Sequence, residues 1–391
     1  MLTLRLKANE DRRLRAGHLW VYSNEIDTRE NYRQIEPGSL CRLEDARGKP
    51  LGLGYVNPQA LLAVRLLSGK ADAQIDSAWF QRRLASALAL RERLYPGPYY
   101  RLVHGESDGL PGIVIDRYGE VLAIQLTTAG AERLRAPLVA ALHALLRPRG
   151  LVFRHDSSSR EAEGLSSTVE VEGEVPARVR IEEGGVAFEV DPREGQKTGW
   201  FYDQADNRER LRRYVRGARV LDVFSYAGAW ALRAAAFGAA AVTAVDRSAA
   251  ALDSARHNAA LNGRELETLE GEALDRLREL RAAGRQFEVV VVDPPALIKK
   301  RKDHAAGLAH YGALNRAALQ LLAPDGVLVS CSCSHHLADD ELQRVLLREA
   351  RAVGRRAALL EQGGQGPDHP VHPAIPETRY LKAFILRAVQ G

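Results

Sequence analysis

Apolar and polar residues alternate in blocks along the second half of the chain, in the order strand, helix, strand. The first such unit lies at residues 219–246, with an apolar run at 220–223, a helix-forming segment at 229–236 and a second apolar run at 242–245. The alternation continues with a third strand that includes Leu269 and ends at Glu272, with apolar runs at 287–292, 327–332 and 380–387, and with helix-forming segments at 248–262, 274–283, 314–322 and 339–353. This pattern predicts an α/β domain with a mostly parallel sheet and helices on both faces, closed by the strand at 380–387.

The first 70 residues follow a different pattern. Leu2, Leu4 and Leu6 alternate with polar residues, and short apolar stretches between turn residues lie at 39–44, 50–56 and 61–67. We expect a small β-rich module here. Its basic and aromatic side chains suit an RNA-binding surface and a purely structural domain equally well.

Between these two parts the pattern is mixed. One amphipathic helix is expected at 77–94, a second helix at 131–146, and strands at 113–116, 121–127 and near 151–153. This predicts a compact α+β middle domain, whose last segment, 157–185, has the least regular pattern. We therefore divide the chain into domains at 1–72, 73–186 and 187–391.

Composition narrows the class of protein. The chain has 391 residues, of which 46% are hydrophobic and 27% are charged, and its formal net charge is +5. This small basic excess suits an RNA or DNA surface but does not require one. The sequence has no apolar run of 18 residues and no signal-like N-terminus, so we expect a soluble, cytoplasmic protein. Its three cysteines lack metal-binding spacing, so no metal site is expected.

Asp246 is the first candidate for chemistry. It follows the second strand of the 219–246 unit, where α/β folds place a carboxylate that accepts hydrogen bonds from ribose hydroxyls. The turn at 224–228 has one glycine, Gly228, in place of a full G-x-G-x-x-G motif. Fewer glycines disfavour a pyrophosphate, so a nucleoside such as S-adenosylmethionine fits better than a dinucleotide. The alternative is an ordinary unit in which Asp246 is solvated.

Two further features end strands at the same predicted edge. Asp293 and Pro294 directly follow a buried apolar strand, and the segment 330–334 (Ser-Cys-Ser-Cys-Ser) ends the next one. A thiol that faces a methyl donor would suggest covalent catalysis, whereas a buried core thiol is the plainer interpretation. Cys333 lies nearer the end of the strand and is the better candidate, while a shift of register by two residues would select Cys331.

Several motifs together resemble a known family. They are FSYAG at 224–228, Asp246, DPPA at 293–296, SCS at 332–334, HGESDGLPGIVIDRYG at 104–119 and GQKTGWFYDQADNR at 195–208. They are similar to those of the RlmI type of 23S rRNA cytosine-5 methyltransferases, and the first 70 residues resemble the PUA module of that family. The resemblance implies a Rossmann-like class I methyltransferase domain preceded by a PUA-like barrel and an α+β middle domain. It implies 23S rRNA or the large ribosomal subunit as partner and leaves open whether the chain forms a homodimer.

The resemblance also implies residue roles. Asp293 would hydrogen-bond the target cytosine near N3 and its amine, and the Cys333 thiolate would add to C6 and make C5 nucleophilic. The target base would have to leave its stack first. The residues implied for S-adenosylmethionine binding are Phe224, Ser225, Tyr226, Ala227 and Gly228 around the methionine part, Asp246 at the ribose, Arg247, Glu272 near the adenine, and Asp293 with Pro294.

One position departs from many RNA cytosine-5 methyltransferases. They have a second cysteine directly after the prolines, where this chain has Ala296. The RlmI type generally lacks that cysteine, and the base that removes the C5 proton is then unassigned. An amino methyltransferase acting on adenine is the alternative enzyme, although it usually has an aromatic residue in place of Ala296. A ribosome-assembly factor without turnover is the second alternative.

Three other features keep two interpretations each. The basic run 299–302 either contacts RNA phosphates or is a solvated loop. The polar and aromatic segment 192–211 is either a lid over the site or a linker between domains. His335 and His336 either lower the pKa of a nearby thiol or are ordinary loop residues.

Overall fold

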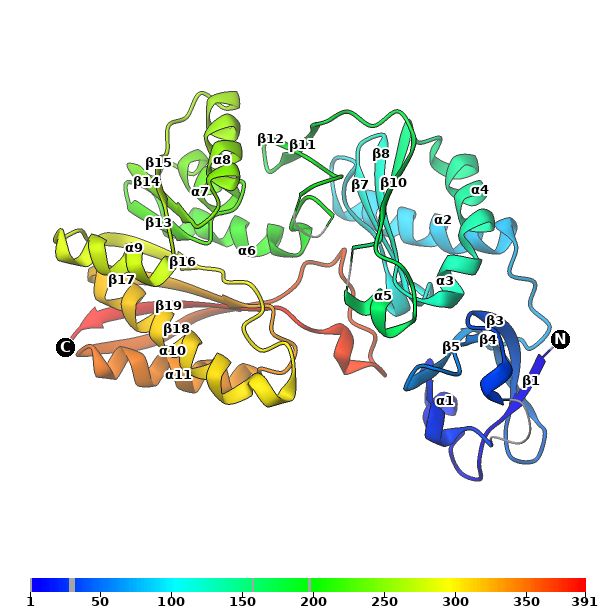
Figure 1. Cartoon of the computed structure of the whole chain (residues 1–391). Coiled ribbons are helices and arrows are strands. Elements are labelled where there is room, and N and C mark those ends of the chain that lie inside the picture. Colours follow the sequence, from blue (N-terminus) through cyan, green and yellow to red (C-terminus); the bar gives the residue numbers. More distant parts are fainter. Residues whose placement is uncertain (1, 28–31, 157, 196–197) are drawn as a thin grey trace. The chain divides into compact units, whose positions relative to one another are not determined.

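The computed structural model of the protein describes residues 2–27, 32–156, 158–195 and 198–391, and Figure 1 shows its helices and strands. The chain divides into two compact units, each built from separate stretches of sequence. The first unit contains Met1–Ile181, Val190–Tyr202 and Pro367–Thr378, and the second contains Glu182–Glu189, Asp203–Gly366 and Arg379–Gly391. No helix in the described part of the chain is long and apolar enough to cross a membrane.

The first unit begins with a five-stranded sheet in the order β1-β3-β4-β5-β2. Alternation along β1 buries Leu4, which together with Leu6 packs into a core with Val21, Val64 and Cys41. This confirms the predicted β-rich module. Its elements are β1 Leu2–Arg5, α1 Arg12–Arg15, β2 Trp20–Tyr22, β3 Ser39–Glu44, β4 Pro50–Val56 and β5 Leu62–Ser68, with short 3-10 turns η1 Ser23–Glu25 and η2 Tyr32–Gln34.

A second five-stranded sheet follows in the order β10-β9-β8-β7-β6. Helix α2 begins where the Asp76 side chain accepts a hydrogen bond from the Trp79 N–H at 2.8 Å, and it buries Phe80 and Leu84 with Leu138 of α4 against the sheet. The elements are α2 Ser77–Leu94, β6 Tyr99–His104, η3 Gly105–Asp108, β7 Ile113–Tyr118, β8 Val121–Leu126, α3 Ala129–Arg133, α4 Arg135–Leu146, β9 Gly150–Arg154, α5 Ser158–Ala162 and β10 Val169–Gly173.

Buried hydrogen bonds join the two sheets of the first unit. The Tyr55 hydroxyl donates to the Pro111 carbonyl oxygen at 3.0 Å, and the Trp20 indole N–H donates to Glu106 at 2.9 Å. The segment Pro367–Thr378, which includes the short turn η7 Pro376–Thr378, packs against the same unit. There the Arg91 guanidinium donates to the Asp368 carbonyl oxygen at 2.7 Å. Residues distant in sequence are thereby fixed in one unit.

The second unit contains a seven-stranded sheet in the order β15-β14-β13-β16-β17-β19-β18. The first five strands in this order run parallel, and β19 is antiparallel to both β17 and β18. The hairpin of β11 Val179–Glu183 and β12 Val186–Val190 precedes it, and the chain passes between the two units within these strands. The sheet strands are β13 Arg219–Val223, β14 Ala241–Asp246, β15 Glu267–Glu270, β16 Phe287–Val292, β17 Leu322–Ser332, β18 Arg355–Gly363 and β19 Lys382–Gln390.

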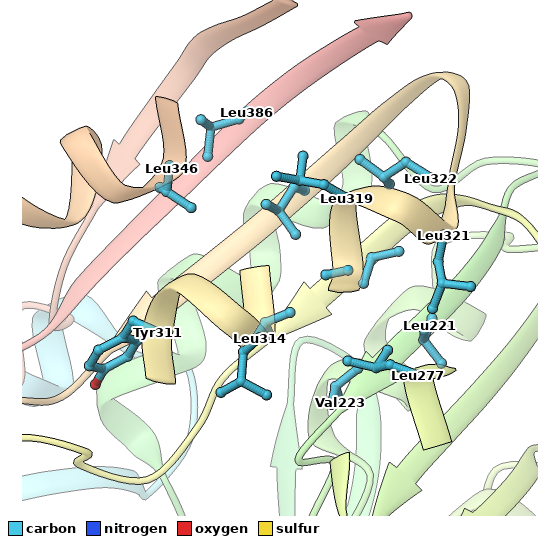
Figure 2. Packing of buried hydrophobic residues seen from close by; sticks show 14 of the residues in the cluster. Leu221, Val223, Leu277, Tyr311, Leu314, Leu319, Leu321, Leu322, Leu346 and Leu386 are labelled. Carbon is cyan, nitrogen blue, oxygen red and sulfur yellow. The ribbon is translucent and has the colours of Figure 1, made fainter. Parts of the chain in front are cut away.

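Helices cover both faces of this sheet. One face packs against α9, α10 and α11, and Figure 2 shows members of this core such as Leu314 and Leu319 of α10 and Leu346 of α11. The other face packs against α7 and α8 through residues such as Trp230 and Leu252. The predicted Rossmann-like α/β architecture is confirmed. The elements are η4 Tyr202–Gln204, α6 Ala205–Arg210, η5 Leu211–Arg213, α7 Ala229–Ala236, α8 Ala249–Leu261, α9 Ala273–Ala282, η6 Arg301–Asp303, α10 His304–Leu321 and α11 Asp339–Ala352.

Four expectations about elements are wrong. The strand at 380–387 does not close the sheet, because β18 lies outside it. The helix expected at 131–146 is two helices, since Pro137 cannot donate a backbone hydrogen bond to the preceding turn. The helix expected at 314–322 begins at His304. The segment 157–185, expected to have the least regular pattern, contains all of α5, β10 and β11.

The domain boundaries at 72/73 and 186/187 stay a prediction. The compact units follow packing, and both the segment Val190–Tyr202 and the segment Pro367–Thr378 belong to the first of them.

Candidate active site

The carboxyl ends of the parallel strands bring the predicted residues to one edge of the sheet. In register, Val223 of β13 pairs with Val245 of β14 and Val292 of β16, and Val292 pairs with Ser330 of β17. The segments that follow these residues therefore emerge side by side. They hold the turn at 224–228, Asp246, Asp293 and Cys333.

The turn between β13 and α7 has an unusual backbone. Phe224 and Tyr226 have φ angles of +69° and +48°, and Gly228 has +81°. Side chains other than glycine rarely adopt this region, so each such residue stores of the order of 1–3 kcal/mol. The Phe224 and Ser225 N–H groups donate to the Val245 carbonyl oxygen at 2.9 and 3.0 Å, which holds the turn against β14. Such strain is concentrated at binding sites.

Asp246 organises the neighbouring backbone. Its two carboxylate oxygens accept hydrogen bonds from the Tyr226 N–H and the Ser248 N–H, both at 2.9 Å. Ser248 in turn accepts from the Ala251 N–H and caps α8. A carboxylate has about four acceptor positions, so Asp246 can still accept from a ligand hydroxyl.

Arg247 and Glu272 lie farther out. Their side chains are 79% and 69% exposed, and the nearest charged atoms of the pair are 4.0 Å apart. Glu272 is not the end of the third strand, as expected; β15 ends at Glu270, and Glu272 is the residue before α9. Both residues lie beyond the strand ends of the same sheet.

Asp293 is held by side chains that the sequence did not single out. The Gln204 amide nitrogen lies 3.0 Å from each carboxylate oxygen, and the Trp230 indole N–H donates to Oδ2 at 2.9 Å. Asn207 donates to the Gln204 amide oxygen at 2.7 Å and so fixes which end of that amide faces Asp293. These two donors are neutral, and the charge that Asp293 does feel comes from the buried Arg208 guanidinium, with which it interacts electrostatically.

A second carboxyl group, Asp222, lies buried in β13. Its Oδ2 accepts from the Ala231 N–H at 3.0 Å, and its Oδ1 has no hydrogen-bond partner among the described residues. Burial, reinforced by the charges of Asp293 and Asp246, raises the pKa of Asp222 to about 8. The group is therefore mostly protonated at neutral pH.

Cys333 directly follows β17, between two fully buried serines. The Tyr311 hydroxyl is hydrogen-bonded to Ser332 at 2.8 Å and to Ser334 at 2.9 Å, and Ser334 also accepts from the Ile298 N–H at 3.0 Å. The half-buried Cys333 sulfur lies 3.9 Å from the Pro294 carbonyl oxygen. The hydrogen bond from the Ile298 N–H to Ser334 thus joins the loop after Asp293 to the loop that carries Cys333.

Cys331 occupies a different environment. It lies within β17, pairs with Ala383 and is fully buried in the core on the α7 side. Burial, with the nearby Asp293 charge, raises the pKa of this thiol well above its ordinary value. A buried thiol of that kind is a poor nucleophile.

A cavity of about 500 Å³ lies beside these loops. It is lined by Arg301, His304, His335, His336, Ala338 and Glu341. His304 Nε2 lies 3.1 Å from Glu341 Oε1. The four basic side chains at 299–302 are all exposed, and none of them forms an ion pair with another described residue.

The segment 192–211 is where the chain passes between the compact units. Residues up to Tyr202 belong to the first unit, and Asp203 begins the second. Gln204 then reaches Asp293, as described above. This favours the linker interpretation for its described part, while Gln196 and Lys197 lie outside the described residues.

Comparisons with known proteins agree with this arrangement. A profile for a PUA-like domain matches residues 4–69, and a profile for an S-adenosylmethionine-dependent methyltransferase matches residues 125–387. Ribosomal RNA large subunit methyltransferase I from Klebsiella pneumoniae (strain 342) is 38% identical over 395 residues, with 98% of each chain covered. The chain belongs to this family. The same enzyme from Escherichia coli (strain SE11) is 38% identical over 392 residues, again with 98% of each chain covered.

Solved structures share the fold of this methyltransferase I family member. A methyltransferase crystallised with SAH aligns with a TM-score of 0.84 at 20% identity and covers 99% of this chain and 100% of its own. A SAM-dependent methyltransferase from Streptococcus mutans aligns with a TM-score of 0.83 at 20% identity, with the same coverage. The predicted order of PUA-like domain, middle domain and methyltransferase domain is confirmed.

The cofactor of this methyltransferase I family member is S-adenosylmethionine, and the sheet edge fits it. Ser225 Oγ is buried without a partner among the described residues, next to the strained backbone of the 224–228 turn. The carboxylates of Asp246 and Asp293 suit hydroxyl donors and a cationic ligand. No cluster of metal-ligating side chains occurs in the described part of the chain.

Sequence reasoning missed Gln204, Trp230, Asp222 and Tyr311. Gln204 lies inside the motif at 195–208, but the motif does not indicate that its side chain binds Asp293. Trp230 and Asp222 lie beside the 224–228 turn in the sequence. Tyr311 has no local signal, because its hydroxyl partners are more than twenty residues away.

Proposed function

We propose that this protein transfers a methyl group from S-adenosylmethionine to C5 of a cytosine in 23S rRNA, through a covalent bond between Cys333 and C6 of the target base. The observation that carries the proposal is the half-buried Cys333 thiol, which lies 3.9 Å from the Pro294 carbonyl oxygen at the end of β17, the strand that pairs with β16 before Asp293. The names of the relatives support large-subunit ribosomal RNA as the substrate.

Cofactor contacts in this proposal follow the sheet edge. The turn 224–228 holds the methionine part, and Asp246 accepts from the ribose hydroxyls. Arg247 and Glu272, being exposed, stay predicted contacts near the adenine. When bound, S-adenosylmethionine supplies an electrophilic methyl group.

The chain's own chemistry begins at C6 of the cytosine. The Cys333 thiolate forms a bond to C6, and the electron pair of the C5=C6 bond becomes available at C5. Asp293 accepts a hydrogen bond from the exocyclic amine and so favours cytosine over uracil, which has an oxygen there. Once C5 carries the methyl group, loss of the C5 proton returns the electron pair and expels the thiolate. The base that takes this proton stays unassigned.

RNA contacts in this proposal extend from the same edge. The exposed basic side chains at 299–302 and the cavity with Arg301, His335 and His336 lie next to the loops that hold Cys333. Cations without protein partners suit backbone phosphates. We propose that the protein acts in the cytoplasm, where bacteria assemble ribosomes; a homodimer stays an untested alternative.

The test is to trap the covalent complex. The protein is incubated with tritiated S-adenosylmethionine and 23S rRNA that carries 5-fluorocytosine, because fluorine at C5 cannot leave as a proton does. We expect a radioactive protein–RNA complex that maps to Cys333, is absent in Cys333→Ala and is retained in the matched control Cys331→Ala.

Other outcomes discriminate between alternatives. A complex that maps to Cys331 would keep the reaction and reassign the nucleophile. Methyl transfer without any covalent complex would contradict the cysteine mechanism and favour an amino methyltransferase. A chain that binds S-adenosylmethionine but methylates neither free rRNA nor assembled subunits would favour a binding factor.

A further inference from the structure

A groove of about 710 Å³ runs along α2 in the first unit. Its lining residues are Trp79, Arg82, Arg83, Ser86, Ala87, Ala89, Leu90, Arg93, Ser107 and Asp108. Ser107 and Asp108 come from η3, in the middle of the HGESDGLPG motif, to which the proposed reaction gives no role. The groove therefore joins a helix and a family-specific motif.

The groove is strongly cationic. Arg82, Arg83 and Arg93 line it, and none of them forms an ion pair with another described residue. The Arg83 guanidinium donates to the Leu67 carbonyl oxygen at 2.8 Å and lies 4.3 Å from the centre of the Trp79 ring. Burial, and then the neighbouring Arg82 charge, lowers the pKa of Arg83. An anion in the groove would relieve this repulsion.

Asp108, the one acidic residue among the described residues that line the groove, does not neutralise these arginines. Asp108 forms a two-pronged ion pair with Arg91 at 2.6 and 2.8 Å, and it also accepts from the His104 N–H at 2.6 Å. Its charge is therefore already matched by a guanidinium outside the groove. The three lining arginines keep a net positive charge.

Two buried polar atoms beside the groove lack partners. Arg83 Nε and Ser107 Oγ are buried, and neither has a hydrogen-bond partner among the residues that the structure describes. Buried polar groups in folded proteins are almost always hydrogen-bonded, so these two donors need an acceptor, which a water or a ligand oxygen in the groove can supply. The ligand must accept hydrogen bonds from a guanidinium and a hydroxyl and carry negative charge.

We infer that this groove binds successive backbone phosphates of RNA, at a site in the middle domain. This rests on the proposed function for the identity of the polymer, since the charge and the donors themselves specify only a phosphate-like anion. Phosphate contacts position a substrate without reading its sequence. The HGESDGLPG motif thus contributes Ser107 to substrate positioning.

The test measures binding of oligouridylate to the full chain over a series of KCl concentrations. Oligouridylate has phosphates but no cytosine, so the result does not depend on the methylation reaction. Arg82→Gln and Arg93→Gln should each reduce the slope of log K against log salt by about 0.7, the value for one single-strand phosphate contact. Ser107→Ala should weaken binding about fivefold without a change of slope.

Arg147→Gln is the matched control, because Arg147 is exposed in the same domain, carries the same charge and forms no side-chain hydrogen bond or ion pair with another described residue. For Arg147→Gln, the inference predicts an unchanged slope of log K against log salt. All four variants should keep the wild-type melting temperature and the wild-type affinity for S-adenosylmethionine. Equal slopes for Arg82→Gln and Arg147→Gln would overturn the inference. Competition by polyglutamate that depends on Arg82 and Arg93 would also overturn it, in favour of an acidic protein segment.

Discussion

Asp293 depends on neighbours for its orientation. Gln204 and Trp230 donate to it, and Asn207 keeps the Gln204 amide nitrogen on the side of the carboxylate. These donors fix the direction of the carboxylate, so that another lone pair can accept from a base amine. We therefore regard Gln204 as a positioning residue for the proposed reaction.

Replacing Gln204 by Glu tests this role. The change puts a second carboxylate about 3 Å from Asp293, and a like charge at that distance favours the protonated form of the pair. We expect the rate of methyl transfer at pH 7 to fall roughly 10- to 100-fold, and the acidic limb of the pH–rate profile to move to higher pH.

The control for this change is Gln204→Met, which removes the donor without adding charge. It should lower the rate with no shift of the acidic limb. If both variants give the wild-type pH profile and rate, Gln204 has no positioning role. S-adenosylmethionine binding, measured by calorimetry, shows whether the site is intact in each variant.

Asp222 should make stability depend on pH. Its ordinary pKa of 3.8 is raised to about 8 by burial in the folded protein. Between these values the folded protein keeps a proton that the unfolded chain has lost, so the free energy of unfolding falls as pH rises, by up to about 1.4 kcal/mol per pH unit. Asp222→Asn cannot titrate and should remove this decline.

Urea unfolding at pH 5 and at pH 7 measures the effect of Asp222→Asn. We compare the free energy of unfolding of the variant with that of the wild type at each pH. The difference should favour the variant more at pH 7 than at pH 5. Asp72→Asn, which changes an exposed carboxylate, should keep the wild-type difference. An equal pH dependence in Asp222→Asn and the wild type would show that Asp222 is ionised in the folded state.

At the scale of elements, the site depends on how β16, β17 and α10 meet. Tyr311 on α10 bridges Ser332 and Ser334, and Ser334 binds the Ile298 N–H of the loop that follows Asp293 and Pro294. The Lys382 ammonium of β19 donates to the Ser334 carbonyl oxygen at 2.8 Å. Helix, loops and strand together fix the backbone that carries Cys333.

Tyr311→Phe should loosen this backbone with little change in shape. The variant leaves two buried serine hydroxyls with one partner fewer each, which costs about 1–3 kcal/mol of stability. We expect kcat for methyl transfer to fall while the KM for S-adenosylmethionine stays unchanged, because the cofactor contacts lie at other strands. Steady-state kinetics measures both.

The matched control for that experiment is Tyr214→Phe, a tyrosine of the same unit whose hydroxyl donates to Glu361. It should leave kcat unchanged. A fall in kcat of similar size in both variants would point to a general loss of stability. A wild-type kcat in Tyr311→Phe would show that the Tyr311 hydroxyl does not position Cys333.

The elements whose bounds the sequence predicted well are those with a clear apolar pattern. Helix α2 has the predicted bounds, and so does β16, because their apolar residues follow helical spacing and a continuous buried run. Strand β18 was missed because five of its nine residues are exposed, so it lacks an apolar pattern, and β10 was missed for the same reason. Both lie at sheet edges.

At the scale of the whole molecule, strand order determined which site residues could be foreseen. Asp246, Asp293 and Cys333 were predictable because the ends of parallel strands share an edge. Gln204 and Tyr311 were not, because their roles arise from contacts between elements that the sequence does not pair. The groove on α2 needed the structure for the same reason, since it joins residues 79–93 to 107–108.

The return of Pro367–Thr378 to the first unit has a consequence for how the protein is made. Arg91 and Arg101 of the first unit bind Asp368, and residues 203–366 of the second unit come before that segment on the chain. A growing polypeptide folds from its N-terminus as domains become complete. During translation, the unit that carries the PUA-like domain therefore lacks part of its packing until residues 203–366 of the second unit have been synthesised, so the first unit cannot mature ahead of the second.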